Sequence, residues 1–317
     1  MLLATDMRRL GGSTVEVSAI GTGTWQWGDT TIWQYGANFN AIDVNAAFKA
    51  SMENGISFFD TAEVYGKGLS ETLLGKAVRK SEKKPIVATK YAPLPIRLNV
   101  AAFEKALDNS LKRLGLETVD LYQIHWPFSL ISQSDLMNGL AKAVKAGKVR
   151  AVGISNYNAP QMKQAYSLLK QMGVPLASNQ VQYNLLYRKP EANGVLETCR
   201  RLNITLIAYS PLAKGLLSGK YSGTAAQAVP GIRRFMPDFR ASGLAKADSV
   251  VREVLAIALE RDKTPSQVAL NWLLSKDELI VAIPGAKNPR QSEQNAGAMG
   301  WRLTEDEKQR LDKVSRK

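Results

Sequence analysis

Three polar side chains at the ends of apolar runs could do chemistry together in this sequence. Asp60, Lys90 and His125 close the strand-like runs 56–60, 86–90 and 121–125, and His125 is the only histidine among the 317 residues. Parallel strands end at one edge of a sheet, so these three side chains are expected to converge there. Tyr65 follows Asp60 by five residues and can reach back over the same edge. The sequence therefore predicts a site that combines a carboxylate, an ammonium, an imidazole and a phenol.

These four groups predict a pocket that donates a proton and stabilises an oxyanion. A tyrosine phenol has an ordinary pKa near 10 and is a poor acid at neutral pH unless a cation lowers that pKa. Lys90 can supply the cation if its ammonium is held close to the phenol, and Asp60 can anchor Lys90. His125 can form a hydrogen bond to a carbonyl oxygen.

Other kinds of catalytic site fit the sequence less well. A zinc site is disfavoured because the sequence contains only one histidine and one cysteine. No Ser-His-Asp triad is evident. Cys199, the only cysteine, lies in an expected helix, where packing is a more common role than nucleophilic catalysis. We therefore expect no metal site and no disulfide within the chain.

Eight apolar runs, separated by amphipathic stretches, must position these residues. The runs are continuous rather than alternating, as expected for strands that are buried on both faces. They span residues 17–21, 56–61, 86–90, 121–125, 151–155, 179–182, 206–210 and 279–284. The alternation predicts a (β/α)8 TIM barrel, an α/β fold, as a single domain over residues 1–317. Function in such a barrel collects at the C-terminal ends of the strands.

Three segments lie outside this regular alternation. Residues 9–17 predict a short β-hairpin before the barrel, and residues 303–311 predict a capped helix packed outside it. The connection from Pro211 to about Lys246 follows the seventh strand and is unusually long for a loop without a function. We interpret it as a flap over the active face.

An open doubly wound sheet is the alternative for a chain of alternating strands and helices. That fold typically carries Gly-x-Gly-x-x-Gly after its first strand. Here the segment from Gly21 to Gln26 lacks the third glycine. The segment from Gly215 to Lys220 is one residue shorter than a P-loop and is followed by Tyr221. The glycine spacing therefore favours the barrel.

The chain is strongly basic, with a net charge of +14 from 42 basic and 28 acidic residues. The basic residues are scattered over the polar faces of expected helices, which favours a solvated surface over nucleic-acid binding. No apolar run reaches the roughly 18 residues of a membrane span, and the start does not resemble a secretory signal. We expect a cytoplasmic protein, or a protein of the plastid stroma if a transit peptide has been removed.

Several motifs, taken in order, resemble those of the aldo-keto reductase superfamily over nearly the whole chain. They are Phe-Asp-Thr-Ala-Glu-Val-Tyr-Gly at 59–66, Ala-Thr-Lys at 88–90, Gln-Ile-His at 123–125, Gly-Ile-Ser-Asn-Tyr at 153–157, Tyr-Ser-Pro-Leu at 209–212 and Ile-Pro-Gly-Ala-Lys at 283–287. The likeness is greatest to the cyanobacterial and plant-plastid branch of uncharacterised aldo/keto reductases. It is carried by Trp-Gln-Trp-Gly at 25–28, Trp-Pro at 126–127 and Gly-Ala-Met-Gly-Trp at 297–301.

This resemblance implies a role for each residue of the site. Tyr65 would be the general acid, tuned by Lys90, which pairs with Asp60, and His125 would orient the carbonyl. The substrate would contact Trp25, Trp33, Tyr65, His125 and Trp126. NADPH would bind extended, without a Rossmann fold. The residues implied to bind it are Gly23, Thr24, Trp25, Asp60, Ser155, Asn156, Gln180, Tyr209, Ser210, Pro211, Leu212, Gly215, Lys220, Arg233, Gly285, Lys287, Gln291, Gln294 and Asn295.

Within this set, the resemblance assigns each group of residues to a part of the cofactor. Ser155, Asn156 and Gln180 would hold the carboxamide, and Tyr209 would stack on the nicotinamide. The segment 210–215, Lys220 and Arg233 would line the pyrophosphate. Lys287 and Gln291 would meet the 2′-phosphate, with Arg290 able to share that role, and Gln294 and Asn295 would meet the adenine.

The expected function is NADPH-dependent reduction of aldehydes or ketones, with small-molecule carbonyls as the partners. One alternative is a nucleotide-sensing subunit, because ion-channel β-subunits share this fold and keep the same four residues with slow turnover. The intact set of four residues favours the enzyme. A phosphate-sugar isomerase on a generic barrel would need paired carboxylates or metal ligands that are not found here.

Overall fold

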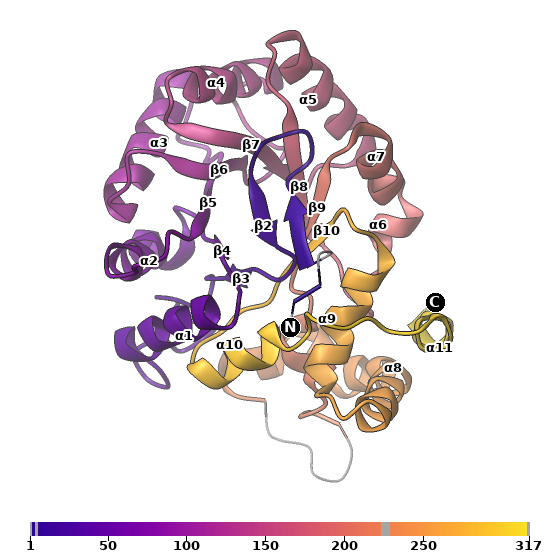
Figure 1. Cartoon of the computed structure of the whole chain (residues 1–317). Helices are drawn as coiled ribbons and strands as arrows, with labels where there is room; N and C mark the ends of the chain where they lie inside the picture. Colours follow the sequence, from indigo (N-terminus) through magenta and orange to yellow (C-terminus); the bar gives the residue numbers. More distant parts are fainter. Residues whose placement is uncertain (1, 4–5, 223–228, 316–317) are drawn as a thin grey trace.

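Eight parallel strands curve into a barrel in the part of the chain that the computed structural model describes, residues 2–3, 6–222 and 229–315 (Figure 1). They are β3 (Thr22–Gly23), β4 (Phe58–Asp60), β5 (Ile86–Tyr91), β6 (Val119–Ile124), β7 (Val149–Ser155), β8 (Leu176–Gln182), β9 (Thr205–Tyr209) and β10 (Ile280–Ile283). Neighbours in the sheet are consecutive in the chain. Parallel bridges of Ile20 with Ala282 and of Gly23 with Gly285 join the first and last strands. The predicted (β/α)8 barrel is confirmed.

Helices follow the strands and surround the barrel in Figure 1. They are α1 (Ala41–Glu53), α2 (Leu69–Arg79), α3 (Val100–Leu114), α4 (Gln133–Lys145), α5 (Ala159–Gln171), α6 (Lys189–Ala192), α7 (Val195–Leu202), α8 (Ala241–Glu260), α9 (Pro265–Lys276), α10 (Pro289–Ala296) and α11 (Glu305–Ser315). Local sequence sets several of their ends. Asn158 and Thr264 form capping boxes at the starts of α5 and α9, and Gly115 ends α3 in the left-handed conformation. None of the helices in the described residues is long and apolar enough to cross a membrane.

The predicted N-terminal hairpin is present and plugs one end of the barrel. Its strands β1 (Met7–Arg9) and β2 (Glu16–Ser18) pair antiparallel and lie across the barrel in Figure 1. Leu10, Val15 and Val17 of the hairpin are fully buried in one cluster with residues of the barrel interior, including Phe58 and Leu121. This apolar plug closes the N-terminal end of the barrel, and the cavity described below lies at the C-terminal ends of the strands.

Two predicted boundaries are wrong. The run 17–21 was expected to be the first barrel strand, but residues 16–18 belong to the hairpin, and the barrel strand begins at Thr22. The residues 17–21 form one apolar run because both ends are buried, although in different layers. Val17 is buried inside the barrel, and Ile20 is buried between the strands and the helices. The long connection after β9 ends at Arg240 rather than near Lys246, because α8 begins at Ala241. Residues 223–228 of that connection lie outside the described part.

The connection after β9 contains short helical turns with a small apolar cluster of their own. The turns are η3 (Ala213–Ser218), η4 (Gly231–Phe235) and η5 (Pro237–Phe239). Leu216, Tyr221 and Phe239 are buried together in this cluster. This packing fixes the backbone that carries Lys214 and Arg233.

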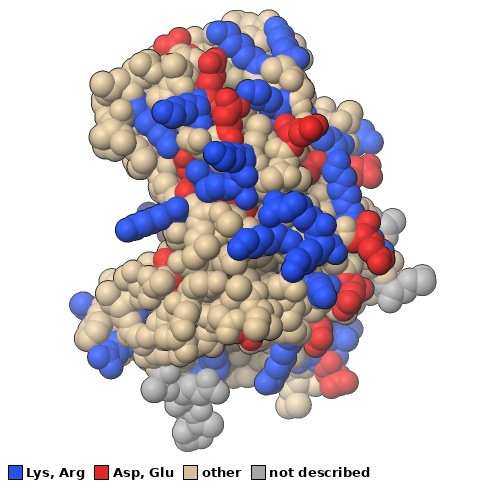
Figure 2. Space-filling view, turned by 90° about the vertical axis from the view of Figure 1, so that its left-hand side faces the viewer, with Lys and Arg blue, Asp and Glu red and all other residues tan. Residues whose placement is uncertain are grey.

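The excess positive charge is spread over the helix surfaces. Figure 2 shows Lys and Arg side chains over the face of the molecule that carries α1 to α3, with acidic side chains among and around them. Lys76, Lys105 and Lys112 are exposed residues of α2 and α3. Intermixed charge of this kind is typical of a solvated surface.

Candidate active site

A cavity of about 950 Å³ opens at the C-terminal ends of the barrel strands. It is lined by the last residues of several strands and by the loops that follow them, as expected for the active face of a barrel. Every residue predicted to contact cofactor or substrate lines this cavity, from Gly23 at the end of β3 to Asn295 on α10. Of the four predicted catalytic residues, only Lys90 does not line it, because Lys90 lies buried beneath the floor.

The floor of the cavity holds a buried ion pair. The Nζ atom of Lys90 lies 2.5 Å from Oδ1 of Asp60 and donates to the carbonyl oxygen of Thr61 at 2.8 Å. Both charged side chains are almost completely buried. The other carboxylate oxygen of Asp60 accepts from the side-chain amides of Gln180 at 2.8 Å and Gln123 at 3.2 Å. These bonds satisfy the buried charges, as a buried pair requires.

Tyr65 is held over this pair by an unusual loop. Its hydroxyl lies 3.4 Å from Nζ of Lys90. The chain then passes through three left-handed residues, Gly66, Lys67 and Gly68, with φ of 55°, 55° and 90°. A Cβ at position 66 would lie 2.7 Å from the carbonyl oxygen of Gly28, so only glycine fits there. The loop therefore fixes the phenol above Lys90.

Two opposing effects act on the phenol of Tyr65. Burial raises its pKa above 10, and the nearby ammonium of Lys90 lowers it in part. Lys90 lowers the pKa of the phenol as expected, but burial raises it by more. The net lowering of the Tyr65 pKa that the sequence suggested is therefore not found. Burial also opposes the charged form of Lys90, yet Asp60 and Tyr65 together raise the pKa of that ammonium. Lys90 consequently remains a cation at neutral pH.

His125 is a neutral imidazole beside the phenol. Burial, followed by the charge of Lys90, lowers its pKa to about 2. Its ring centroid lies 5.7 Å from that of Tyr65, edge to face, and 3.9 Å from that of Trp126, to which it is parallel. A neutral imidazole carries one N–H donor, which suits hydrogen bonding to a carbonyl oxygen without proton transfer from the ring.

A chain of hydrogen bonds connects the next predicted residues. The hydroxyl of Ser155 donates to the carbonyl oxygen of Gln180 at 2.9 Å and accepts from the side-chain amide of Asn156 at 3.1 Å. The hydroxyl of Tyr209 in turn donates to the side-chain oxygen of Asn156 at 3.0 Å. The ends of β7, β8 and β9 thus present one rigid polar surface to the cavity.

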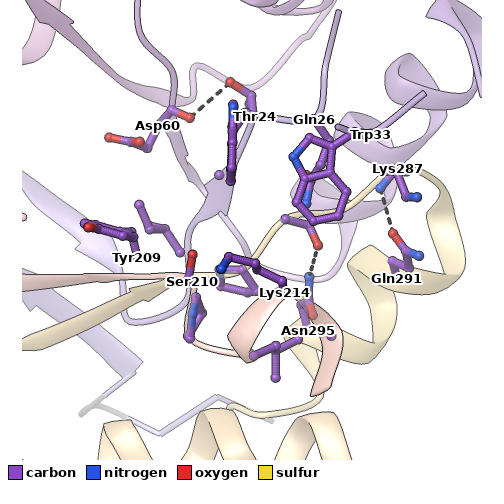
Figure 3. Close-up of a pocket in the computed structure, with 18 of the residues that line it drawn as sticks. Thr24, Gln26, Trp33, Asp60, Tyr209, Ser210, Lys214, Lys287, Gln291 and Asn295 are labelled. Atoms are coloured by element: carbon purple, nitrogen blue, oxygen red, sulfur yellow. Dashed lines mark hydrogen bonds between the residues drawn. The ribbon is translucent and has the colours of Figure 1, made fainter. Parts of the chain in front are cut away.

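Five cations line the cavity away from Asp60, and one of them, Lys214, is paired with Asp238 at 2.8 Å. They are Lys214, Lys220, Arg233, Lys287 and Arg290. Burial, followed by the charges of Arg233 and Lys220, lowers the pKa of Lys287 to about 8. Asp60 is the only carboxylate among the described lining residues, and it lies at the opposite end (Figure 3). The far end is therefore suited to an anion with more than one charge.

The structure adds lining residues that the sequence reasoning did not assign. Gln26 and Lys214 project toward the cavity in Figure 3, and both lie beside predicted residues, which was the available signal. A Cβ at position 285 would lie 1.9 Å from the amide nitrogen of Gln26, so Gly285 leaves room for that side chain. Other unassigned lining residues are Val64, Ser218, Thr264, Pro265, Ser266, Ile283, Pro284 and Asn288.

Comparison with known proteins shows the family of this chain. Residues 19–316 match the model of the aldo/keto reductase family, so the chain belongs to that family. It is 38% identical over 314 residues to the chloroplastic pyridoxal reductase of Arabidopsis thaliana, covering 94% of this chain and 83% of that protein. It is also 31% identical over 309 residues to the aldo-keto reductase YhdN of Bacillus subtilis, covering 95% and 90% of the two chains.

Solved structures share the fold of this chain. A glycerol dehydrogenase from Gluconobacter oxydans superposes with a TM-score of 0.85 at 29% identity, covering 98% of this chain and 95% of that one. An aldo-keto reductase from Klebsiella pneumoniae, solved in complex with NADPH, superposes with a TM-score of 0.77 at 28% identity. That match covers 97% of this chain and 95% of the other.

Proposed function

We propose that this protein is an NADPH-dependent reductase that converts aldehydes or ketones to alcohols, with Tyr65 as the general acid. The observation that carries the proposal is the position of the Tyr65 hydroxyl, which lies 3.4 Å from the buried Lys90–Asp60 pair and faces the cavity. Membership of the aldo/keto reductase family supports the class of reaction.

Each of the four residues has a defined task in this reaction. The carbonyl oxygen of the substrate would accept hydrogen bonds from Tyr65 and from the neutral ring of His125. As the carbonyl carbon is reduced, the proton of Tyr65 moves to the oxygen, which completes the alcohol. The phenolate that remains is stabilised by Lys90, and Asp60 keeps Lys90 in place until solvent returns the proton.

The far end of the cavity fits the phosphates of a dinucleotide. Lys220, Arg233 and Lys287 would neutralise them. Burial and the neighbouring charges of Arg233 and Lys220 lower the pKa of Lys287, so an anion bound there would stabilise its charged form. The polar surface of Ser155, Asn156 and Gln180 would hold the carboxamide beside the ring of Tyr209. When bound, NADPH supplies the hydride. A reductase from Klebsiella pneumoniae that binds NADPH supports this choice of cofactor.

The substrate end of the cavity favours a flat, uncharged aldehyde. Trp25, Trp126 and Val64 line it together with the neutral His125, and the cations of the cavity lie at the other end. Flat aromatic surfaces of this kind bind ring compounds by stacking. A relative named pyridoxal reductase makes pyridoxal, an aromatic aldehyde, the first substrate to test.

The test of the proposed function is a steady-state assay of NADPH consumption at 340 nm. Pyridoxal is compared with a straight-chain aldehyde and with pyridoxal 5′-phosphate, whose added charge has no cation to meet it at the substrate end. We expect turnover with pyridoxal to exceed turnover with the phosphate ester. If the protein binds NADPH but turns over no carbonyl in repeated cycles, the nucleotide-sensing alternative is favoured and the proposed reductase is wrong.

Lys287→Ala is expected to weaken NADPH binding while leaving NADH binding nearly unchanged. The reason is that the lost ammonium would meet the 2′-phosphate, and one charge-assisted hydrogen bond is worth about 1.5–3 kcal/mol, or roughly 10- to 100-fold in Kd. Isothermal titration with both cofactors measures the change. Lys76→Ala, an exposed lysine on α2, is the matched control for the altered net charge. Equal weakening of both cofactors in Lys287→Ala would contradict the 2′-phosphate assignment.

NADPH binding should also depend on pH through Lys287. With its pKa at about 8, the side chain of Lys287 is protonated below pH 8 and becomes neutral above it. Binding of a dianionic phosphate requires the charged form, so Kd should rise above pH 8 by up to about tenfold per pH unit, with one proton taken up. Titration between about pH 7 and pH 9, in buffers of different ionisation enthalpy, detects both effects. Lys287→Ala should abolish this dependence, whereas a flat Kd for the unmodified protein would show that Lys287 does not meet the phosphate.

A further inference from the structure

The chain leaves β9 through several residues in the left-handed conformation. Ser210, Ala213 and Lys214 have φ of 49°, 48° and 56°, and Gly215 follows with φ of 102°. Residues other than glycine rarely adopt positive φ, because their Cβ atom crowds a neighbouring carbonyl oxygen, so the surrounding structure must hold them there. Ser210, Lys214 and Gly215 line the cavity, and Figure 3 shows Tyr209, Ser210 and Lys214 in succession along it.

Asn184, in the loop after β8, holds the first of these residues. Its side-chain amide donates to the carbonyl oxygen of Ser210 at 2.9 Å. The same oxygen accepts the backbone N–H of Ala213 at 2.9 Å, so both of its lone pairs are used. The backbone N–H of Tyr183 donates to the carbonyl oxygen of Tyr209 at 3.4 Å. Two consecutive residues after β8 thus bind two consecutive carbonyl groups where the chain leaves β9.

The side chain of Asn184 is itself firmly placed. It is 1% exposed, and its oxygen accepts the backbone N–H of Leu186 at 2.9 Å. The backbone of Asn184 also exchanges hydrogen bonds with that of Tyr187, at 3.2 and 3.0 Å. The bond from Leu186 determines that the amide nitrogen faces Ser210. Asn184 is not among the described residues that line the cavity, so any effect on a bound ligand must pass through the residues that it holds.

We infer that Asn184 is a positioning residue, whose side-chain amide holds Ser210 in the left-handed conformation and so preforms the surface that receives the nicotinamide and the pyrophosphate. The inference rests on the proposed binding of NADPH, in which Tyr209 and the segment 210–215 meet the cofactor. Without the amide of Asn184, the free protein relaxes to an ordinary backbone conformation at Ser210. Binding must then restore the strained conformation, so the apparent affinity falls with the fraction of molecules that are competent to bind.

Asn184→Ser separates the contact with Ser210 from the local turn. The serine hydroxyl is one bond shorter than the amide nitrogen, so it does not reach the carbonyl oxygen of Ser210, whereas it can still accept the N–H of Leu186. We expect the Kd for NADPH to rise about tenfold, as for a competent fraction of about one tenth. The Kd for NADH should rise by the same factor, because the nicotinamide and the pyrophosphate are common to both cofactors. Isothermal titration measures both, and this shared loss differs from that of Lys287→Ala, which is confined to NADPH.

Asn271→Ser is the matched control. Asn271 is a fully buried asparagine on α9, and its amide donates to the carbonyl oxygens of Ala298 and Trp301 at 2.8 Å, in the segment after α10. This variant should lower the melting temperature but leave the Kd of both cofactors unchanged. If it weakens both cofactors as much as Asn184→Ser does, the loss comes from general destabilisation and the inference is wrong.

Replacement of Ser210 tests whether Asn184 acts through the backbone conformation of that residue. Ser210→Gly and Ser210→Ala both remove the hydroxyl, but only glycine adopts positive φ without steric cost. When each is combined with Asn184→Ser, we expect the glycine variant to bind NADPH about fivefold more tightly than the alanine variant. In the presence of Asn184, the same two replacements should give nearly equal Kd values. Equal Kd values for the two double variants would overturn the inference.

The outcomes separate this inference from the proposed function. If Asn184→Ser binds both cofactors with a Kd within about twofold of that of the unmodified protein, the inference is wrong and the proposed function is intact. A loss confined to NADPH also overturns it, because the effect would then lie at the 2′-phosphate. If the unmodified protein binds neither cofactor, the proposed function is wrong and the inference falls with it.

Discussion

Tyr65→Phe is expected to reduce turnover by about 10²- to 10⁴-fold while NADPH binding is kept, because the change removes only the proton donor. The ring is preserved, so its contact with His125 and the packing of the loop remain. His125 is a poor substitute as the acid, because burial and the charge of Lys90 lower its pKa to about 2 and keep the ring neutral.

Two measurements check this result. Steady-state rates at saturating NADPH and aldehyde give the change in kcat, and isothermal titration gives the affinity for NADPH. Thermal melting confirms that the fold is unchanged. A kcat close to that of the unmodified protein would show that another group protonates the carbonyl oxygen, and the assignment of Tyr65 would be wrong.

Lys90→Met should abolish activity and also destabilise the fold. The ammonium opposes the effect of burial on the phenol, so its loss makes Tyr65 a still weaker acid. It also leaves Asp60 as a buried charge without its cation, for which removal of one partner costs about 3–5 kcal/mol. We expect a lower melting temperature together with a loss of turnover.

A double variant separates the two effects of Lys90. Asp60→Asn combined with Lys90→Met removes both charges, so the unpaired carboxylate is gone, and most of the lost stability should return. Activity should not return, because the phenol still lacks its cation. If the double variant melts no higher than Lys90→Met, the lost stability has a cause other than the unpaired carboxylate. Activity in either variant near that of the unmodified protein would contradict the pairing of Lys90 with Tyr65.

The sequence by itself determined the barrel and the meeting of the residues that we propose to be catalytic. Continuous apolar runs mark strands that are buried on both faces, and in a parallel barrel all such strands end at the same face. Asp60, Lys90 and His125 therefore converge once their runs are recognised, and the residues after β7, β8 and β9 follow by the same rule. The fold and the convergence of these residues could be predicted because strand and helix periodicity is a local property of the sequence.

Element boundaries needed the tertiary structure where one apolar run serves two layers. Val17 and Ile20 read as a single strand in the sequence, yet Val17 plugs the barrel interior and Ile20 packs under the helices. Similarly, α8 begins at Ala241, within the segment predicted as a loop. Hydrophobicity alone does not state which layer buries a side chain, so these boundaries depended on packing.

The electrostatic character of the site was decided only by the tertiary structure. Burial outweighs Lys90 at Tyr65, and it makes His125 neutral. The pKa of Lys287 falls because folding buries its side chain and brings Arg233 and Lys220, from the connection after β9, near it. Trp33 likewise meets Arg233 and Lys287 only through folding. A pKa depends on the sum of contacts from segments that are distant in sequence, whereas the strand pattern that brings those segments together is local.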